Sequence, residues 1–284
     1  MSYLILAIFA SVSVSIFLKL VRVQNIDVRQ AILINYMTAI FLALLFLKPD
    51  FSQGLPKFGT APSFIFIALG VLLPSVFIVM AKAVDRVGIV KSDAAQRLAL
   101  FLPIIASFTI FNEVLTTQKA IGITLAFLAL FLLVYKENIQ KSYDVKSSIM
   151  VLLGVWLGYG VIDILFKQMS KLGNAFSVTL LITFVLAFVI MLGYLLIKRT
   201  AWQAKSLGSG VILGILNFSN ILFYVKAHQA FKSDPTLVFA GMNIGVICLG
   251  TLVGLFLFKE KVSKINLSGV MIGMIAIWCL FYLQ

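Results

Sequence analysis

The chain has 284 residues, of which 62% are hydrophobic and only 12% are charged. A soluble chain of this size cannot bury so much apolar surface, so soluble enzymes, nucleic-acid-binding domains and disordered chains are excluded. The net charge of +13 comes from basic residues clustered in short gaps between apolar runs, which is where they lie at the surface of a membrane. The composition therefore predicts an integral membrane protein.

The apolar runs are continuous and long enough for helices that cross a hydrocarbon core about 30 Å thick. They do not alternate with polar residues as the strands of a barrel do. In chain order, the predicted transmembrane helices cover residues 2–19, 31–47, 62–82, 89–111, 118–135, 147–167, 175–197, 207–227, 235–258 and 265–283. The charged segment 136–146 is the predicted linker between two halves, residues 1–135 and 147–284.

The two halves resemble each other in sequence. At one common offset, the matched pairs are Phe111 with Phe258, Glu113 with Glu260, Gly122 with Gly269, Ala129 with Ala276, and Leu133 with Leu280. Several matches at one offset indicate a duplication. Because each half has an odd number of spans, the second copy must enter the membrane in the opposite sense, as in many secondary transporters. The predicted fold is all-α and integral to the membrane, with ten transmembrane helices in a 5+5 inverted repeat.

A short pattern recurs at the end of each half: a helix with Pro or Gly, then Glu, a small polar residue, and Gly in the following helix. The residues are Pro103, Glu113, Thr116 and Gly122 in the first half, and Gly250, Glu260, Ser263 and Gly269 in the second. In this pattern, and in Lys19 and Lys167 at the end of each half's first helix, the chain resembles EamA-type members of the drug/metabolite transporter superfamily. The resemblance covers the whole chain and implies a ten-helix transporter. It does not name the substrate, because the family carries amino acids, nucleosides, sugar derivatives and drugs.

Polar side chains inside the predicted spans are candidate binding residues, because they are costly in lipid. Many are spaced four residues apart and so share one helix face. The predicted substrate-binding residues are Ser11, Ser15, Lys19, Asn35, Asp93, Gln96, Arg97, Tyr159, Asp163, Lys167, Asn217, Asn220, Tyr224 and Asn243. We expect these side chains to converge on an interior cavity.

Structural alternatives exist for several of these residues. Asp163 and Lys167 can form an ion pair near a helix end, and long lysine side chains can extend to the membrane surface. Asp93 and Arg97 can form a pair solvated at the membrane surface, and Asn217, Asn220 and Asn243 can hold helices together. We interpret His228, Glu113 and Glu260 as structural residues. A solvated loop is expected at Lys82, Asp85, Arg86 and Lys91.

Proline and glycine are distributed differently in the two halves. Pro74 and Pro103 allow kinks in the first half. Pairs of glycines four residues apart allow close helix packing in the second half. These pairs are Gly154/Gly158, Gly210/Gly214, Gly241/Gly245, Gly250/Gly254 and Gly269/Gly273.

The charges of the candidate set suggest the kind of solute. If Asp93 pairs with Arg97 and Asp163 with Lys167, Lys19 remains to meet a carboxylate. A small zwitterionic or carboxylate-bearing solute such as an amino acid fits best, and the first span lacks the acidic residue that captures cations in small multidrug pumps. A proton on Asp93 or Asp163 would couple transport to a pH gradient, and facilitated movement is the alternative.

No enzyme motif, cofactor site or metal-ligand spacing is recognisable, and Cys248 and Cys279 lie inside apolar runs. The expected partners are the lipid bilayer and a small polar solute, without nucleic acid, and a channel is the alternative to a transporter. We expect an exporter in a bacterial inner membrane. The odd-numbered gaps carry most of the Lys and Arg residues and predict termini outside the cytoplasm, whereas the family resemblance implies termini inside.

Overall fold

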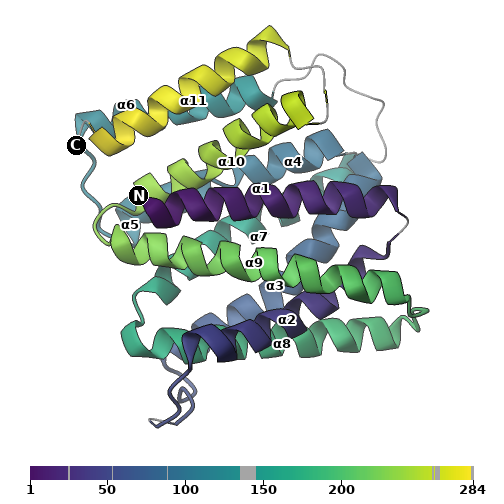
Figure 1. Cartoon of the computed structure of the whole chain (residues 1–284). Coiled ribbons are helices and arrows are strands. Elements are labelled where there is room, and N and C mark those ends of the chain that lie inside the picture. The colour runs from purple at the N-terminus through teal and green to yellow at the C-terminus, as the bar shows by residue number, and fades with distance from the viewer. Residues whose placement is uncertain are drawn as a thin grey trace.

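The computed structural model of the chain describes residues 1–24, 26–52, 54–87, 89–134, 145–257, 259 and 263–282. Within these residues all regular structure is helical, and most helices run side by side in one bundle (Figure 1). The α-helices are α1 (Ser2–Val23), α2 (Val28–Leu47), α3 (Ala61–Val87), α4 (Ile89–Leu98), α5 (Phe101–Thr109), α6 (Thr117–Val134), α7 (Val145–Ser170), α8 (Phe176–Ile197), α9 (Ala204–Ala230), α10 (Pro235–Leu257) and α11 (Lys264–Tyr282), and the 3₁₀ helix η1 (Gly173–Ala175) precedes α8. Residues 136–144 of the predicted linker, with Phe258 and Glu260, lie outside the described residues.

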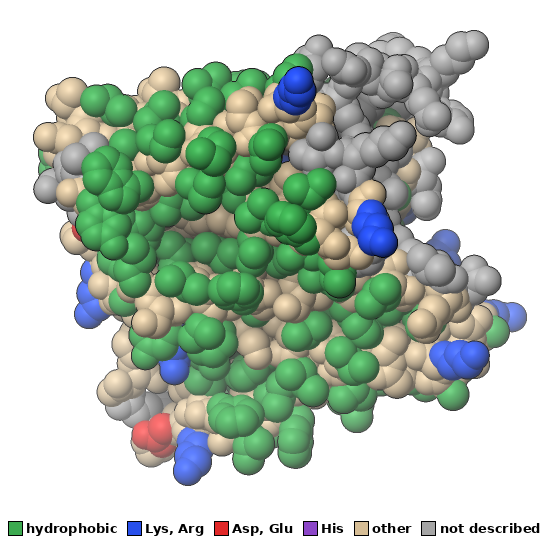
Figure 2. All heavy atoms as spheres, turned by 45° about the horizontal axis from the view of Figure 1, so that its top comes forward, with side chains coloured by type: hydrophobic (Ala, Val, Ile, Leu, Met, Phe, Trp, Pro, Cys, Tyr) green, Lys and Arg blue, Asp and Glu red, His purple; other side chains and the backbone are tan. Residues whose placement is uncertain are grey.

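Eight helices of the described chain are long and apolar enough to cross a membrane: α1, α2, α3, α7, α8, α9, α10 and α11. The helix α6 is apolar as well but shorter. Large hydrophobic side chains such as Phe41, Phe64 and Phe256 are exposed, and hydrophobic side chains cover much of the face in Figure 2, with Lys and Arg mainly toward its edges. Soluble monomers rarely expose large apolar patches. The chain therefore has the architecture of an integral membrane protein, as its composition predicts.

The predicted span 89–111 is not one continuous helix. It is divided into α4 and α5, with a turn at Ala99 and Leu100 between them. Pro103 accounts for this break, because its nitrogen carries no hydrogen and cannot donate to the carbonyl of Ala99. The prediction of a single α-helix was wrong at this point. A short turn with tighter hydrogen bonds, such as Leu102 N–H to the Ala99 carbonyl at 3.1 Å, lies where a kink at Pro103 was expected.

Neighbouring residues stabilise the interruption. The indole nitrogen of Trp156 on α7 donates to the Leu98 carbonyl at 3.0 Å, which satisfies an acceptor at the end of α4. A Cβ on Gly160 of α7 would lie 3.1 Å from the Ala99 carbonyl oxygen, so α7 approaches the turn closely. The helix α10, which carries Gly250 where the sequence alignment has Pro103, is continuous, because glycine keeps its N–H.

Helix contacts between the two halves occur in matching pairs. The helix α1 packs against α9 and α10, and α7 packs against α3, α4 and α5. The helix α2 packs against α9, and α8 packs against α3. Two further contacts join α2 with α8 and α6 with α11. The halves are therefore interleaved, and neither forms a separate bundle.

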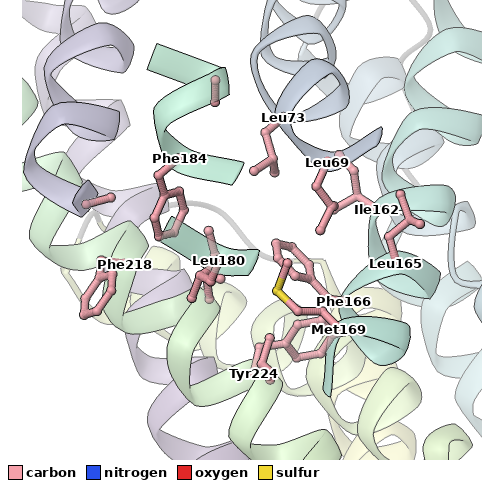
Figure 3. Close-up of a cluster of buried hydrophobic side chains, with 14 of the residues drawn as sticks. Leu69, Leu73, Ile162, Leu165, Phe166, Met169, Leu180, Phe184, Phe218 and Tyr224 are labelled. Atoms are coloured by element: carbon pink, nitrogen blue, oxygen red, sulfur yellow. The ribbon is translucent and has the colours of Figure 1, made fainter. Parts of the chain in front are cut away.

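The main buried cluster includes residues of α3, α7, α8 and α9. Figure 3 shows its side chains gathered between these helices, among them Leu69, Phe166, Leu180 and Phe218. The rings of Phe166 and Tyr224 meet edge-on, with centroids 6.2 Å apart. Close packing of this kind holds side chains in single rotamers, so the cluster fixes the helices that carry the polar residues described next.

Candidate functional site

The described residues surround a cavity of about 930 Å³ inside the bundle. Its wall is built from α1, α2, α3, α4, α7, α8, α9 and α10, so both halves contribute. The volume falls within the range of small-molecule sites, about 300–1,000 Å³. Most of the predicted binding residues lie on this wall: Ser11, Ser15, Asp93, Gln96, Arg97, Tyr159, Asp163, Asn217, Asn220, Tyr224 and Asn243. Side chains from separate predicted spans thus meet on one surface.

The cavity extends toward one end of the bundle. Its wall includes Arg29 in the first turn of α2, Lys82 near the end of α3, and Gln203 just before α9. These residues adjoin the α1–α2, α3–α4 and α8–α9 connections, and we call this side of the bundle the open end. The α5–α6, α7–α8 and α9–α10 connections lie at the opposite side, the closed end, and contribute none of the described wall residues.

Two of the three carboxylates on the described wall are paired with arginines. An oxygen of Asp93 lies 3.4 Å from Nε of Arg97, one turn along α4. Asp27 accepts from Nε and Nη2 of Arg29 at 3.0 and 2.9 Å. The third carboxylate, Asp163, accepts from the Tyr224 hydroxyl at 3.1 Å, and no basic side chain of the described residues forms an ion pair with it.

Sequence reasoning missed the charged residues at the open end. Asp27 caps the N-terminus of α2, where its side chain accepts from the backbone N–H of Arg29. Partial burial raises the pKa of Asp27, but the hydrogen bonds and charge of Arg29 lower it by more, so the pKa lies below its ordinary value. An N-cap aspartate just before an apolar run is a detectable signal, but it identifies a helix start and not a cavity wall.

Lys82 and Gln203 were also not predicted as wall residues. Lys82 was expected in a solvated loop. It lies instead within α3, where its side chain is exposed and lines the open end of the cavity. Gln203 donates its backbone N–H to the Gln30 side chain at 2.9 Å and so joins the second half to the first. Neither sequence position carries a periodic signal, because both lie at helix ends.

Lys19 does not lie on the described cavity wall, which corrects the prediction that it meets a substrate carboxylate. Its side chain is exposed near the end of α1, whereas Ser11 and Ser15 of the same helix line the cavity. Four residues advance about 400° around a helix, so each such step rotates the side chain about 40° beyond a full turn. Over two steps from Ser11, Lys19 is rotated away from the cavity.

Asn35 lies behind the wall and not on it. It is buried, and its Oδ1 accepts from Nδ2 of Asn217 at 3.1 Å. This bond joins α2 to α9, so Asn35 holds helices together instead of facing a solute. The backbones of α2 and α9 approach each other closely, and this contact buries the Asn35 side chain and leaves it no access to the cavity.

Lys167 is likewise not a wall residue, and its expected ion pair with Asp163 is not formed. The side chain is 1% exposed, and Nζ donates to the carbonyls of Lys232 at 3.1 Å and His228 at 3.5 Å. These carbonyls lie at the C-terminal end of α9, where a helix has unpaired acceptors and partial negative charge. The long side chain therefore reaches the closed end and caps α9.

At the closed end, a network of charged side chains joins the first half of the chain to the second. Glu113, from the α5–α6 connection, accepts from the backbone N–H and hydroxyl of Thr236 at 3.0 and 2.7 Å, which caps α10. Nζ of Lys119 lies 3.0 Å from Glu113 and 2.6 Å from Asp234. We call Glu113, Lys119, Asp234 and Thr236 the closed-end network. It gives Glu113 the structural role that the sequence predicts.

His228 is completely buried in the last turn of α9. Its ring lies between those of Tyr224 and Phe239, with centroid distances of 4.8 and 4.6 Å. Neither ring nitrogen has a hydrogen-bond partner among the described residues. The aromatic contacts make His228 part of the helix packing, as the sequence predicts.

The wall chemistry suits reversible binding. It offers amide, hydroxyl, carboxylate and guanidinium groups, which hold a solute by hydrogen bonds and charge. Within the described ranges, no group of three His, Cys, Asp or Glu side chains is placed to hold a metal ion.

Comparison with known proteins finds a relative in sequence and solved structures that share the fold. The chain is 54% identical over 289 residues to an uncharacterized protein of Haemophilus influenzae, with 100% of this chain and 99% of the relative covered. A crystal structure of another protein shares the fold, with a TM-score of 0.73 over 100% of this chain and 99% of that chain, at 12% sequence identity. No family model matches the sequence. By its identity over the full length, the chain belongs to the same protein family as the Haemophilus influenzae protein.

Proposed function

We propose that the protein is a secondary transporter that moves a small polar solute across the membrane by alternating access. The observation that carries this proposal is the cavity, which places polar side chains from both halves inside a bundle of apolar helices. Polar and ionisable groups at such positions are costly and mark solute pathways. A cavity with one open and one closed end is also what one state of an alternating-access cycle requires.

An inverted repeat of five plus five crossings underlies this proposal. We count α4 and α5 as one interrupted crossing. The matching helix contacts support a two-fold relation between the halves, since α1 packs on α9 as α7 packs on α3. Reciprocal glycine contacts support it too: Leu280 packs on Gly122, and Leu133 packs on Gly269. Interrupted helices beside a central site are typical of transporters with inverted repeats, and this architecture is the one expected of EamA-type proteins.

The proposed direction is export from the cytoplasm across a bacterial inner membrane. The open end is rich in basic residues, such as Lys198 and Arg199 after α8 and Lys205 in the first turn of α9. The positive-inside rule then places the open end in the cytoplasm, where the cavity collects its solute. A reporter fused after the last residue tests this orientation. Alkaline phosphatase activity is expected, and a fluorescent cytoplasmic reporter would instead place the open end outside the cytoplasm.

The solute that we propose is an amino acid or a similar zwitterion. The wall offers guanidinium and ammonium groups at Arg97, Arg29 and Lys82, and a carboxylate at Asp163. Opposite charges on one wall complement a solute that carries both signs.

Counterflow in liposomes tests transport directly. Vesicles containing the purified protein and loaded with an unlabelled amino-acid mixture are expected to accumulate external labelled amino acids transiently and saturably. A channel gives no saturable counterflow. If amino acids and nucleosides both fail to exchange while the protein remains folded, the transport proposal is wrong.

A further inference from the structure

The inner wall of the cavity presents hydrogen-bond acceptors. The Nδ2 group of Asn217 donates to Asn35, and Nδ2 of Asn243 donates to the Phe239 carbonyl at 3.1 Å. Both amides line the cavity, and their nitrogens are engaged within the protein. These two asparagines therefore present mainly their carbonyl oxygens to a solute.

Asn220 adds a third amide oxygen to this wall. It lies on α9 between Asn217 and Tyr224, and all three line the cavity. Its Oδ1 is buried against the protein and has no hydrogen-bond partner among the described residues, so a solute reaches this oxygen once the side chain turns toward the cavity. An unsatisfied acceptor in a buried site costs about 1–3 kcal/mol, and a donor on a bound solute would remove that cost.

Asp163 adds a carboxylate to the same cavity wall. Its only described hydrogen bond comes from the Tyr224 hydroxyl. The other wall carboxylates, on Asp27 and Asp93, are neutralised by arginines. A carboxylate without a cationic partner is costly within a membrane, so the inner wall favours a cation that can donate hydrogen bonds.

We propose that Asp163, Asn217, Asn220 and Asn243, here called the acceptor cluster, bind a protonated amine of the transported solute. An ammonium group has three donors and no acceptor, which matches a cavity wall that carries a carboxylate and several amide oxygens. This inference rests on the proposed transport function and narrows its substrate class to solutes with an ammonium group. The substrate is thus held by its amine, in place of the carboxylate contact that the sequence predicted at Lys19.

Thermal unfolding of the detergent-purified protein tests the cluster with matched probes. The probes are amino-acid amides, which carry an α-ammonium and no carboxylate, and their deamino analogues, which lack only the amine. We expect the amides to raise the melting temperature in a concentration-dependent way and the deamino analogues to leave it unchanged. Equal shifts from both series would overturn the proposal.

Variants assign the effect to the cluster. Asp163→Asn removes the charge but keeps the shape, and is expected to weaken amide binding at least tenfold, since hydrogen bonds to charged groups contribute about 1.5–3 kcal/mol. Asp50→Asn, in the exposed α2–α3 connection, is the matched control and is expected to bind as the wild type does. Undiminished binding by Asp163→Asn contradicts the assignment.

A second variant decides the matter if Asp163→Asn does not fold. Asn220→Leu removes the unpartnered oxygen without breaking any hydrogen bond of that oxygen, so the fold is expected to hold while amide binding weakens about tenfold. Unchanged binding would overturn the proposal.

Counterflow separates this inference from the transport proposal. If amino acids and their N-acetyl derivatives exchange equally, transport stands and the amine site fails. If amides bind through Asp163 but no amino acid exchanges, the amine site stands and the transport proposal fails.

Discussion

The backbone oxygen of Ala31 on α2 lies 2.6 Å from the position that a Cβ on Gly210 of α9 would occupy. One turn further along α9, a Cβ on Gly214 would lie 2.9 Å from the Asn35 backbone oxygen. The two helices therefore meet backbone to backbone, as glycines four residues apart allow. This contact brings Asn217 within hydrogen-bonding distance of Asn35 and so sets the position of one side of the cavity.

Gly210→Ala is expected to destabilise the protein by about 1–3 kcal/mol, because the added methyl group overlaps backbone atoms that cannot rotate away. Gly208→Ala is the control in the same helix, since a Cβ there has no neighbour within 4 Å and alanine is the better helix former. Thermal unfolding in detergent is the measurement. Equal melting temperatures for the two variants would contradict the close approach of α2 and α9.

Pro103→Ala tests the role of the interrupted helix. Alanine restores the N–H that can donate to the Ala99 carbonyl, so α4 and α5 are expected to join more continuously. On the proposed transport cycle this variant lowers the counterflow rate. Pro62→Ala is the control, because Pro62 lies in the first turn of α3, where no N–H is needed. A Pro103→Ala protein with wild-type counterflow would show that the interruption is dispensable.

The closed-end network predicts a pH dependence of stability. Partial burial raises the pKa of Asp234, but hydrogen bonds from Lys119 and Ser233 lower it by more, so the pKa lies below its ordinary value. A depressed carboxylate pKa stabilises the folded state above the unfolded pKa of about 3.9. That contribution is lost as the pH falls through the folded pKa.

Asp234→Asn is therefore expected to be less stable than the wild type near neutral pH, by about 1.5–3 kcal/mol for the lost charged hydrogen bonds. The difference between the two proteins is expected to shrink as the pH falls below about 4. Melting temperatures across this range provide the comparison. A difference that does not change with pH would rule out Asp234 as the titrating group.

Lys167→Met separates capping from substrate binding. The variant removes the ammonium that caps α9 and is expected to lower stability by about 1.5–3 kcal/mol. Because Lys167 is absent from the described wall, the melting-temperature shift caused by amino-acid amides is expected to remain. Lys171→Met is the control, since it loses one exposed contact with the Phe111 ring, which is typically worth about 0.5–1 kcal/mol. Loss of the amide-induced shift in Lys167→Met would return this lysine to the binding site.

Much of the architecture follows from the sequence because lipid imposes a simple rule. Long apolar runs must become helices, and the predicted spans correspond to the observed helices except at 89–111. Polar residues within the predicted spans, many of them four residues apart, supplied most of the polar side chains of the cavity wall, including Asp163 and Tyr224. Spacing of this kind is local, and the chain carries it whatever the helices pack against.

The tertiary structure alone decided which polar residues share a surface. Lys19, Asn35 and Lys167 are polar residues of predicted spans like the wall residues, yet one is exposed and two are buried in contacts with other parts of the protein. Their partners, such as the end of α9 for Lys167, lie far away in the sequence. The orientation of a side chain in a bundle depends on how neighbouring helices are rotated and how closely their backbones approach. No pattern within a single span contains that information.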